Sequence, residues 1–196
     1  MRATLVSKNA GKARELAALL PGWEIEPTEA EELPEETGAT YYENARAKAL
    51  HGRAVGEPDR WVIGEDSGLE VAGLAGRPGI LSARYAGEGA TDEENVRKLL
   101  GDLDGVAGEG RRARYVSELV CISPELEEAR GSGILEGRIA EEPRGSAGFG
   151  YDPVFVPVGE ERTVAELGEA WKARRSHRAA AAAALLQAVG SAPEEL

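Results

Sequence analysis

The chain has 196 residues, of which 42% are hydrophobic and 30% charged; this composition excludes disorder and predicts one sizeable core, so we expect a single domain over residues 1–196. The formal net charge of -12 argues against a nucleic-acid polymer as the main partner, because phosphate backbones are bound through basic surfaces. No apolar run approaches the roughly 20 residues needed to cross a bilayer, so no membrane partner is expected.

The first six residues form a strand-like run without the long apolar core and small-residue cleavage site of a secretory signal, so we expect a cytoplasmic protein. The single cysteine, Cys121, lies in the apolar run 115–122, which indicates a buried and inert thiol. The basic residues comprise five lysines and eighteen arginines. Because arginine supplies most of the positive charge, the few lysines are candidates for positions that need a compact ammonium.

A strand at 4–6, a turn at 7–12 and a helix at 12–20 predict an anion site near the start of the chain. Free backbone N–H groups, the positive end of the helix dipole and the Lys12 ammonium would converge there. The spacing is not that of a P-loop. An ordinary helix-capping role for Asn9 is the simpler alternative.

Residues 40–55 predict a helix in which Asn44 and Lys48 share one face, with Glu43 adjacent to it. That face either lines a cleft or is solvated. The acidic stretch 24–36 before it predicts a short strand and an exposed loop, and no function is expected there.

The apolar residues 61–63 predict a buried strand that breaks at Gly64 into a turn carrying Glu65, Asp66 and Ser67. Ligands bind at strand ends in open α/β sheets, and two neighbouring carboxylates can share a divalent cation or divide the roles of base and ligand. A solvated polar turn is the alternative.

The next segments combine hairpins with strand–helix units. Residues 80–87 predict a mobile loop or lid, and 91–94 form a capping box on a helix that runs to 100. The runs 111–122 and 129–139 predict an antiparallel pair of strands. The combination predicts an α/β fold with a mixed sheet.

Two stretches near the end of the chain are candidates for binding a nucleotide. Residues 145–155 combine glycines with Phe149 and Tyr151, whose rings offer faces for a base, although a hairpin with packed aromatics fits equally well. The basic stretch 171–178 is either a second anion or carbonyl-oxygen site around Lys172 or a solvated turn. It precedes a helix expected at 179–189 and capped by Ser176.

Six of these stretches follow one another in the order of a known set of motifs. They are S-K-N-A-G-K at 7–12, E-N-A-R-A-K-A at 43–49, D-S-G-L at 66–69, the lid at 78–87, F-G-Y-D-P at 149–153 and K-A-R-R-S-H-R at 172–178. Together they resemble the motifs of the inosine triphosphate pyrophosphatase family. Each motif alone is a weak signal, but six in order are a strong one.

The resemblance implies a fold and an activity. The fold would be α/β, with an elongated mixed central sheet flanked by helices and two lobes with the active-site cleft between them, usually as a homodimer. The activity would be hydrolysis of noncanonical purine nucleoside triphosphates (ITP, dITP, XTP and dXTP) to the monophosphate and pyrophosphate, which keeps them out of DNA and RNA. Water would attack the α-phosphorus with the assistance of Mg²⁺.

The resemblance also implies roles for residues of this chain. Catalysis is expected from Asp66, Glu65 and Lys12, and we expect Asp66 to orient or deprotonate the water, assisted by Glu65 or Glu43. Carboxylates such as Glu43 and Asp66 would hold Mg²⁺. The expected substrate-binding residues are Ser7, Lys8, Asn9, Ala10, Gly11, Lys12, Lys48, Ser67, Phe149, Gly150, Tyr151, Asp152, Lys172, His177 and Arg178.

Base selection is expected at the end of the site that carries Phe149, whose ring would lie against the purine. Lys172, His177 and Arg178 would donate hydrogen bonds to the 6-oxo group of hypoxanthine or xanthine, and the same donors would face the 6-amino group of adenine unfavourably. Two alternatives are a related pyrophosphatase acting on other modified nucleotides, including pyrimidines, and a catalytically silent nucleotide-binding module.

Overall fold

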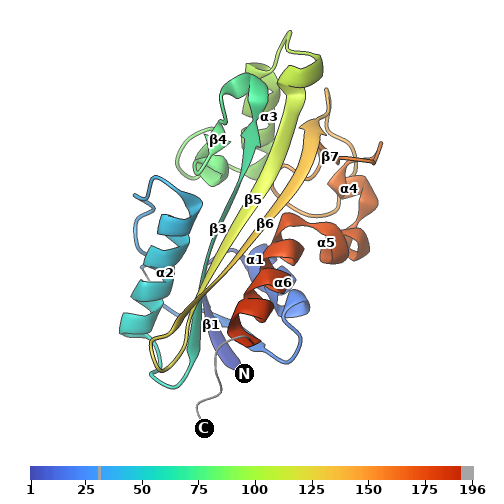
Figure 1. The fold of residues 1–196 in the computed structure, drawn as a ribbon. Helices are drawn as coiled ribbons and strands as arrows, with labels where there is room; N and C mark the ends of the chain where they lie inside the picture. The colour runs from blue at the N-terminus through green and yellow to red at the C-terminus, as the bar shows by residue number, and fades with distance from the viewer. Residues whose placement is uncertain (31, 191–196) are drawn as a thin grey trace. The chain divides into compact units, whose positions relative to one another are not determined.

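The chain folds around a mixed sheet of seven strands, described in the computed structural model for residues 1–30 and 32–190 (Figure 1). Six strands follow the order β2-β1-β3-β5-β6-β7, and β4 pairs with β3. The strands are β1 (Arg2–Val6), β2 (Glu24–Pro27), β3 (Trp61–Val71), β4 (Pro78–Gly79), β5 (Arg112–Ile122), β6 (Glu128–Ile139) and β7 (Phe155–Pro157). β1 pairs in parallel with β2 and β3, whereas β4 and β7 are antiparallel to their neighbours. The predicted mixed sheet is confirmed.

The chain divides into two compact units, each with its own apolar core. Among the described residues, unit 1 contains residues 1–30, 32–66, 117–133 and 177–190. Unit 2 contains Ser67–Val116 and Ile134–Ser176. The strands β3, β5 and β6 each contribute residues to both units.

In unit 1, helices cover both faces of the strands. The helices α1 (Ala10–Leu19) and α6 (His177–Gly190) pack with Leu5, Ile63 and Leu119 in one core cluster. The helix α2 (Tyr41–Val55) packs on the other face through a separate cluster that includes Ala45, Ala49 and Val120 (Figure 1).

The central strand β3 does not break at Gly64, and the predicted turn at 64–68 is wrong. Glu65 and Asp66 instead lie within one continuous strand, Trp61–Val71. A Cβ atom at residue 64 would meet two backbone atoms of α2, at 2.0 Å from Ala45 O and 2.7 Å from Ala49 N. Glycine at this position therefore allows the backbone of α2 to approach the strand closely. A glycine inside a strand often marks such a close approach of another backbone and need not end the strand.

Unit 2 is built around a cluster that includes Leu69, Leu99, Val154 and Phe155. Its helices are α3 (Asp92–Asp102), α4 (Val164–Leu167) and α5 (Glu169–Arg175), with short 3₁₀ turns at Ala72–Leu74, Ser82–Arg84 and Gly108–Arg111. The capping box predicted at 91–94 is present, with both of its hydrogen bonds formed.

One open alternative is excluded, and one helix boundary needs correction. The basic stretch that begins at Trp171 is mostly the helix α5 and not a solvated turn, and Lys172 is buried in it. The last helix begins at His177, two residues earlier than expected. Among the described residues, no helix has both the length and the apolar character needed to cross a bilayer.

Candidate active site

Of the predicted phosphate-binding residues 7–12, residues 7–9 form the turn, and α1 begins at Ala10, two residues earlier than expected. Asn9 is the N-cap of this ten-residue helix, and its Oδ1 accepts the Lys12 N–H at 3.1 Å. The Asn9 N–H donates to Ser7 Oγ at 3.1 Å, which fixes the turn from its other side. The simple capping role of Asn9 is therefore present, and it places the positive end of the helix at this turn.

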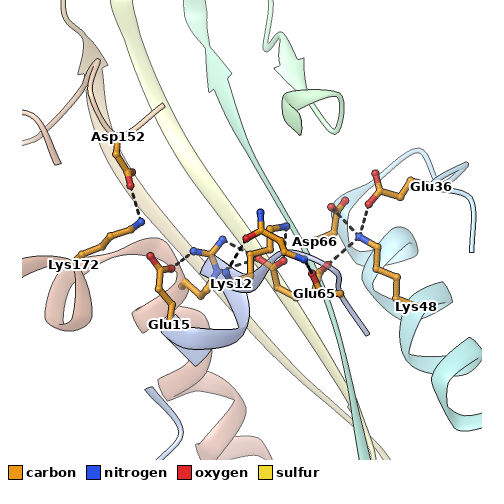
Figure 2. A network of polar contacts seen from close by, with 11 residues as sticks. Lys12, Glu15, Glu36, Lys48, Glu65, Asp66, Asp152 and Lys172 are labelled. Carbon is orange, nitrogen blue, oxygen red and sulfur yellow. Dashed lines mark hydrogen bonds and ion pairs between the residues drawn. The ribbon is translucent and has the colours of Figure 1, made fainter. Parts of the chain in front are cut away.

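Glu65 is fully buried in unit 1 and is paired with two cations (Figure 2). Lys12 Nζ lies 2.7 Å from Glu65 Oε2, and Arg178 Nε and Nη2 lie 3.2 and 3.1 Å from Oε1. Burial alone would raise the pKa of Glu65, but the Lys12 and Arg178 charges outweigh it and hold that pKa well below its usual range. Glu65 therefore remains ionised and fixes both cations.

Asp66, the next residue of β3, has different surroundings. Asn44 Nδ2 donates to its Oδ2 at 3.0 Å, and Lys48 Nζ lies 3.5 Å from its Oδ1. Burial raises the pKa of Asp66 above its ordinary value, and the nearby lysines only partly oppose this effect. A carboxylate with a raised pKa is suited to accepting a proton from water. The neighbours Glu65 and Asp66 thus have opposite pKa shifts.

Lys48 connects Asp66 to a carboxylate that the sequence did not single out. Its Nζ lies 2.5 Å from Glu36 Oε1 and donates to the Glu65 carbonyl oxygen at 3.1 Å (Figure 2). Burial lowers the pKa of Lys48, but the charges of Asp66 and Glu36 outweigh this effect and raise the pKa above its ordinary value. The side chain is therefore a cation between two anions. Glu36 lies at the end of an acidic segment, and nothing local distinguishes it from the other acids there.

Glu43, the other expected metal ligand, is exposed in the first turn of α2. Its Oε2 accepts the Ala39 N–H at 2.6 Å, so its carboxylate is bonded to the backbone just before the N-cap, Thr40. No group of three or more acidic, histidine or cysteine side chains suited to a metal ion occurs in the part of the chain that the structure describes. The two carboxylates that share the Lys48 ammonium, those of Glu36 and Asp66, do offer the hard oxygen ligands that Mg²⁺ requires.

Arg178 and Glu15 extend the charged network of unit 1. Arg178 and the adjacent His177 are buried in the first turn of α6, and Arg178 Nη1 also contacts the Glu15 carboxylate. Glu15 was not predicted. It lies three residues after Lys12 on α1, a spacing that places both on one side of the helix, and this spacing is the signal that could have identified it.

In unit 2, two expected substrate-binding residues, Lys172 and Asp152, form a second buried ion pair. His177 and Arg178, which were expected beside Lys172 at the base, belong to unit 1, where Arg178 pairs with Glu65 and Glu15. Lys172 Nζ lies 2.7 Å from Asp152 Oδ2 (Figure 2). The same Nζ lies 4.0 Å from the centre of the Phe149 ring. The Phe149 N–H donates to the same carboxylate oxygen at 3.0 Å. A cation therefore lies over a half-buried aromatic ring whose backbone is tied to the cation's partner.

Tyr151 does not present a free ring to a ligand. It belongs to the core cluster of unit 2, and its hydroxyl donates to the Ser82 carbonyl oxygen at 2.8 Å. The alternative of a packed aromatic therefore describes Tyr151 but not Phe149. The two other expected residues of this unit are less buried: Ser67 lies on β3 just after Asp66, and the Gly150 N–H donates to Asp92 Oδ2 at 2.7 Å.

Comparisons with known proteins all match members of one family, and the matches extend over almost the whole chain. The model of the Ham1 family matches residues 3–188. The dITP/XTP pyrophosphatase of Methylococcus capsulatus is 47% identical over 192 residues, covering 92% of this chain and 92% of the relative. That of Thermus thermophilus is 44% identical over 198 residues, covering 98% and 94%. The structure of the Staphylococcus aureus Ham1 protein has a TM-score of 0.83 at 37% identity, covering 96% and 97% of the two chains. That of a HAM1 protein from Coxiella burnetii has a TM-score of 0.85 at 35% identity, covering 98% and 100%.

Proposed function

Because the chain belongs to the Ham1 family, we propose that it hydrolyses noncanonical purine nucleoside triphosphates, namely dITP, ITP, XTP and dXTP, to the monophosphate and pyrophosphate. Relatives 42 to 49% identical to it are named dITP/XTP pyrophosphatases. The observation that carries the proposal is the contrast between two adjacent buried carboxylates. Glu65 lies between the Lys12 ammonium and the Arg178 guanidinium, at 2.7 and 3.1 Å, whereas Asp66 accepts a hydrogen bond from Asn44 at 3.0 Å and lies 3.5 Å from Lys48 Nζ. In these surroundings burial raises the pKa of Asp66.

This contrast divides the chemical work between the two residues. Asp66 would orient the attacking water and accept its proton, because a carboxylate with a raised pKa is the stronger base of the pair. Glu65 would keep the Lys12 ammonium in place at the start of α1, where it can attract the phosphates together with the helix N-terminus. Asn44 holds Asp66 Oδ2, which leaves the orientation of the carboxylate fixed.

A divalent cation fits the donor groups of this site. The ammonium of Lys48 lies between Glu36 and Asp66, so these two carboxylates are already placed within reach of one common cation. We therefore propose Glu36 with Asp66, and not Glu43, as the carboxylates that hold Mg²⁺. When bound, Mg²⁺ would neutralise charge on the leaving pyrophosphate.

The base would be recognised by the ion pair of unit 2. The Phe149 ring offers a face for stacking, and Lys172 supplies a donor suited to a 6-oxo group. The 6-amino group of adenine would face this donor instead of an acceptor, a mismatch that leaves buried polar groups unpaired and costs up to ~10⁴-fold in specificity.

We further propose that the protein acts as a single domain and as a cytoplasmic homodimer. Its substrates would be free nucleotides and not nucleic-acid polymers.

The test is to incubate the purified protein with dITP, ITP, XTP, GTP and ATP, with and without Mg²⁺, and to separate pyrophosphate from orthophosphate. Metal-dependent release of pyrophosphate from the hypoxanthine and xanthine nucleotides, with GTP and ATP nearly untouched, is the expected result. Asp66→Asn should bind dITP but lose at least ~100-fold in turnover, because its amide cannot accept the proton.

Other results would contradict specific parts of the proposal. Release of orthophosphate would mean that water attacks a different phosphorus atom. Equal hydrolysis of every nucleotide would contradict the role of Phe149 and Lys172, and binding of dITP without any product would favour a silent nucleotide-binding module. Turnover by Asp66→Asn within a few-fold of the wild type would contradict the assignment of the base.

A further inference from the structure

A hydrogen bond in unit 2 joins the helix α3 to the loop of residues 145–150, which we call the aromatic loop because it carries Phe149. Asp92, the first residue of α3, accepts the Gly150 N–H through Oδ2 at 2.7 Å. Gly150 directly follows Phe149, the residue whose ring lies against the Lys172 ammonium. The bond therefore acts one residue away from the proposed base-stacking ring.

The aromatic loop has little other support on this side. Gly145, Gly148 and Gly150 all have positive φ angles, of 78, 82 and 63°, so the backbone takes conformations that other residues rarely adopt. A pocket of about 640 Å³ lies between the loop and α3, and it is lined by residues of both. On its other side the loop is held by the bond from the Phe149 N–H to Asp152 Oδ2, at 3.0 Å. On the side that faces α3 it borders a hollow, which the bond to Asp92 bridges.

The helix α3 is in contrast firmly anchored. Thr91 and Glu94 form both bonds of its capping box, and Val96 and Leu99 are buried in the core of unit 2. Buried Asn95 bonds to two backbone groups of the 80–87 segment: its Nδ2 donates to Ala83 O at 3.1 Å, and its Oδ1 accepts the Ala86 N–H at 2.8 Å. None of these contacts involves Asp92, so the helix should remain in place without its carboxylate.

We infer that Asp92 is a positioning residue that fixes the aromatic loop through Gly150 and so holds the Phe149 ring ready for the base. The acceptor is a carboxylate on a rigid helix, and hydrogen bonds to a charged partner are stronger than neutral ones. The consequence for base binding rests on the proposed function. The structural part, that the loop depends on Asp92, does not.

Kinetics with dITP test the functional part. Asp92→Ala should raise KM about tenfold, with kcat changed less than about threefold, because the bond orders the loop before the base binds but does not touch the reacting atoms. Asp92→Asn keeps an oxygen acceptor and should restore KM to within about threefold of the wild type. Glu93→Ala is the matched control: it removes the same charge from the same helix turn and lines the same pocket, and no bond from Glu93 to the loop is found in the described part of the chain.

Amide hydrogen exchange at Gly150, followed by NMR in ¹⁵N-labelled protein without nucleotide, tests the structural part. Exchange should accelerate at least about tenfold in Asp92→Ala and stay near the wild-type rate in Asp92→Asn and Glu93→Ala. Unchanged exchange or unchanged KM in Asp92→Ala would overturn the inference, as would equal effects in Glu93→Ala. If the wild type does not hydrolyse dITP, the proposed function fails, and Gly150 exchange still decides whether Asp92 holds the loop.

Discussion

Replacing Glu65 with glutamine should destabilise unit 1 strongly while changing few atoms. The side chain is fully buried, with Lys12 Nζ 2.7 Å from one carboxylate oxygen and Arg178 Nη2 3.1 Å from the other. Removing the shared anion leaves both cations without their closest counter-charge, although Arg178 keeps its contact with Glu15. Breaking a buried ion pair from one side costs about 3 to 5 kcal/mol, and we expect Glu65→Gln to lose an amount in this range.

The pH dependence of the loss gives a second test. The folded-state pKa of Glu65 lies below its ordinary value of 4.5, so its contribution to stability is fully present above that pH and is lost as the pH falls through the folded-state pKa. Glutamine cannot titrate. The difference in unfolding free energy between the wild type and Glu65→Gln should therefore be largest near neutral pH and should shrink steadily in acid.

Urea unfolding of both proteins, followed by far-UV circular dichroism at neutral pH and at several acidic pH values, measures this difference. Glu118→Gln is the control, because Glu118 is also buried in unit 1 but pairs with Arg130, whose side chain is 51% exposed. We expect it to lose only about 1 kcal/mol. A loss for Glu65→Gln no larger than that of the control, or one that does not shrink in acid, would refute the reasoning.

Two further predictions concern packing and the metal. Gly64→Ala should lower the free energy of unfolding in urea by at least about 3 kcal/mol, because its Cβ would lie 2.0 Å from Ala45 O. In the control Gly101→Ala the new Cβ would meet, apart from the neighbouring backbone of α3, no atom of the described residues within 4 Å, and the change should stabilise α3 by about 0.5 to 1 kcal/mol. Similar values for the two variants would contradict the close approach of α2 to β3. Glu36→Gln should raise the Mg²⁺ concentration needed for half-maximal dITP hydrolysis by about tenfold or more, and Glu43→Gln should raise it by less than about threefold. The reverse order in a metal titration would identify Glu43 as the ligand instead.

The sequence was most informative where the signal is local. The capping box at 91–94 and the helix at 40–55 depend on residues within a few positions of one another, and both form as predicted, with Thr40 as the N-cap of the helix. The predicted turn at 7–12 forms only over residues 7–9, because α1 begins at Ala10. The order of six motifs likewise indicated a family that the comparisons support. Local propensity gave the wrong prediction at Gly64, because glycine by itself favours a turn. In the structure this glycine instead lets the backbone of α2 approach β3, and that contact joins segments that are distant in the sequence.

The sequence by itself thus determined the elements, the class of sheet and the residues among which a nucleotide site should be sought. Only the tertiary structure decided which charged groups surround each acid. Glu36 joins Asp66 through Lys48 from a different element, and Glu65 is held ionised by Arg178, 113 residues further along the chain. Burial and the distances between charges set these roles, and both arise from contacts that no short stretch of sequence contains.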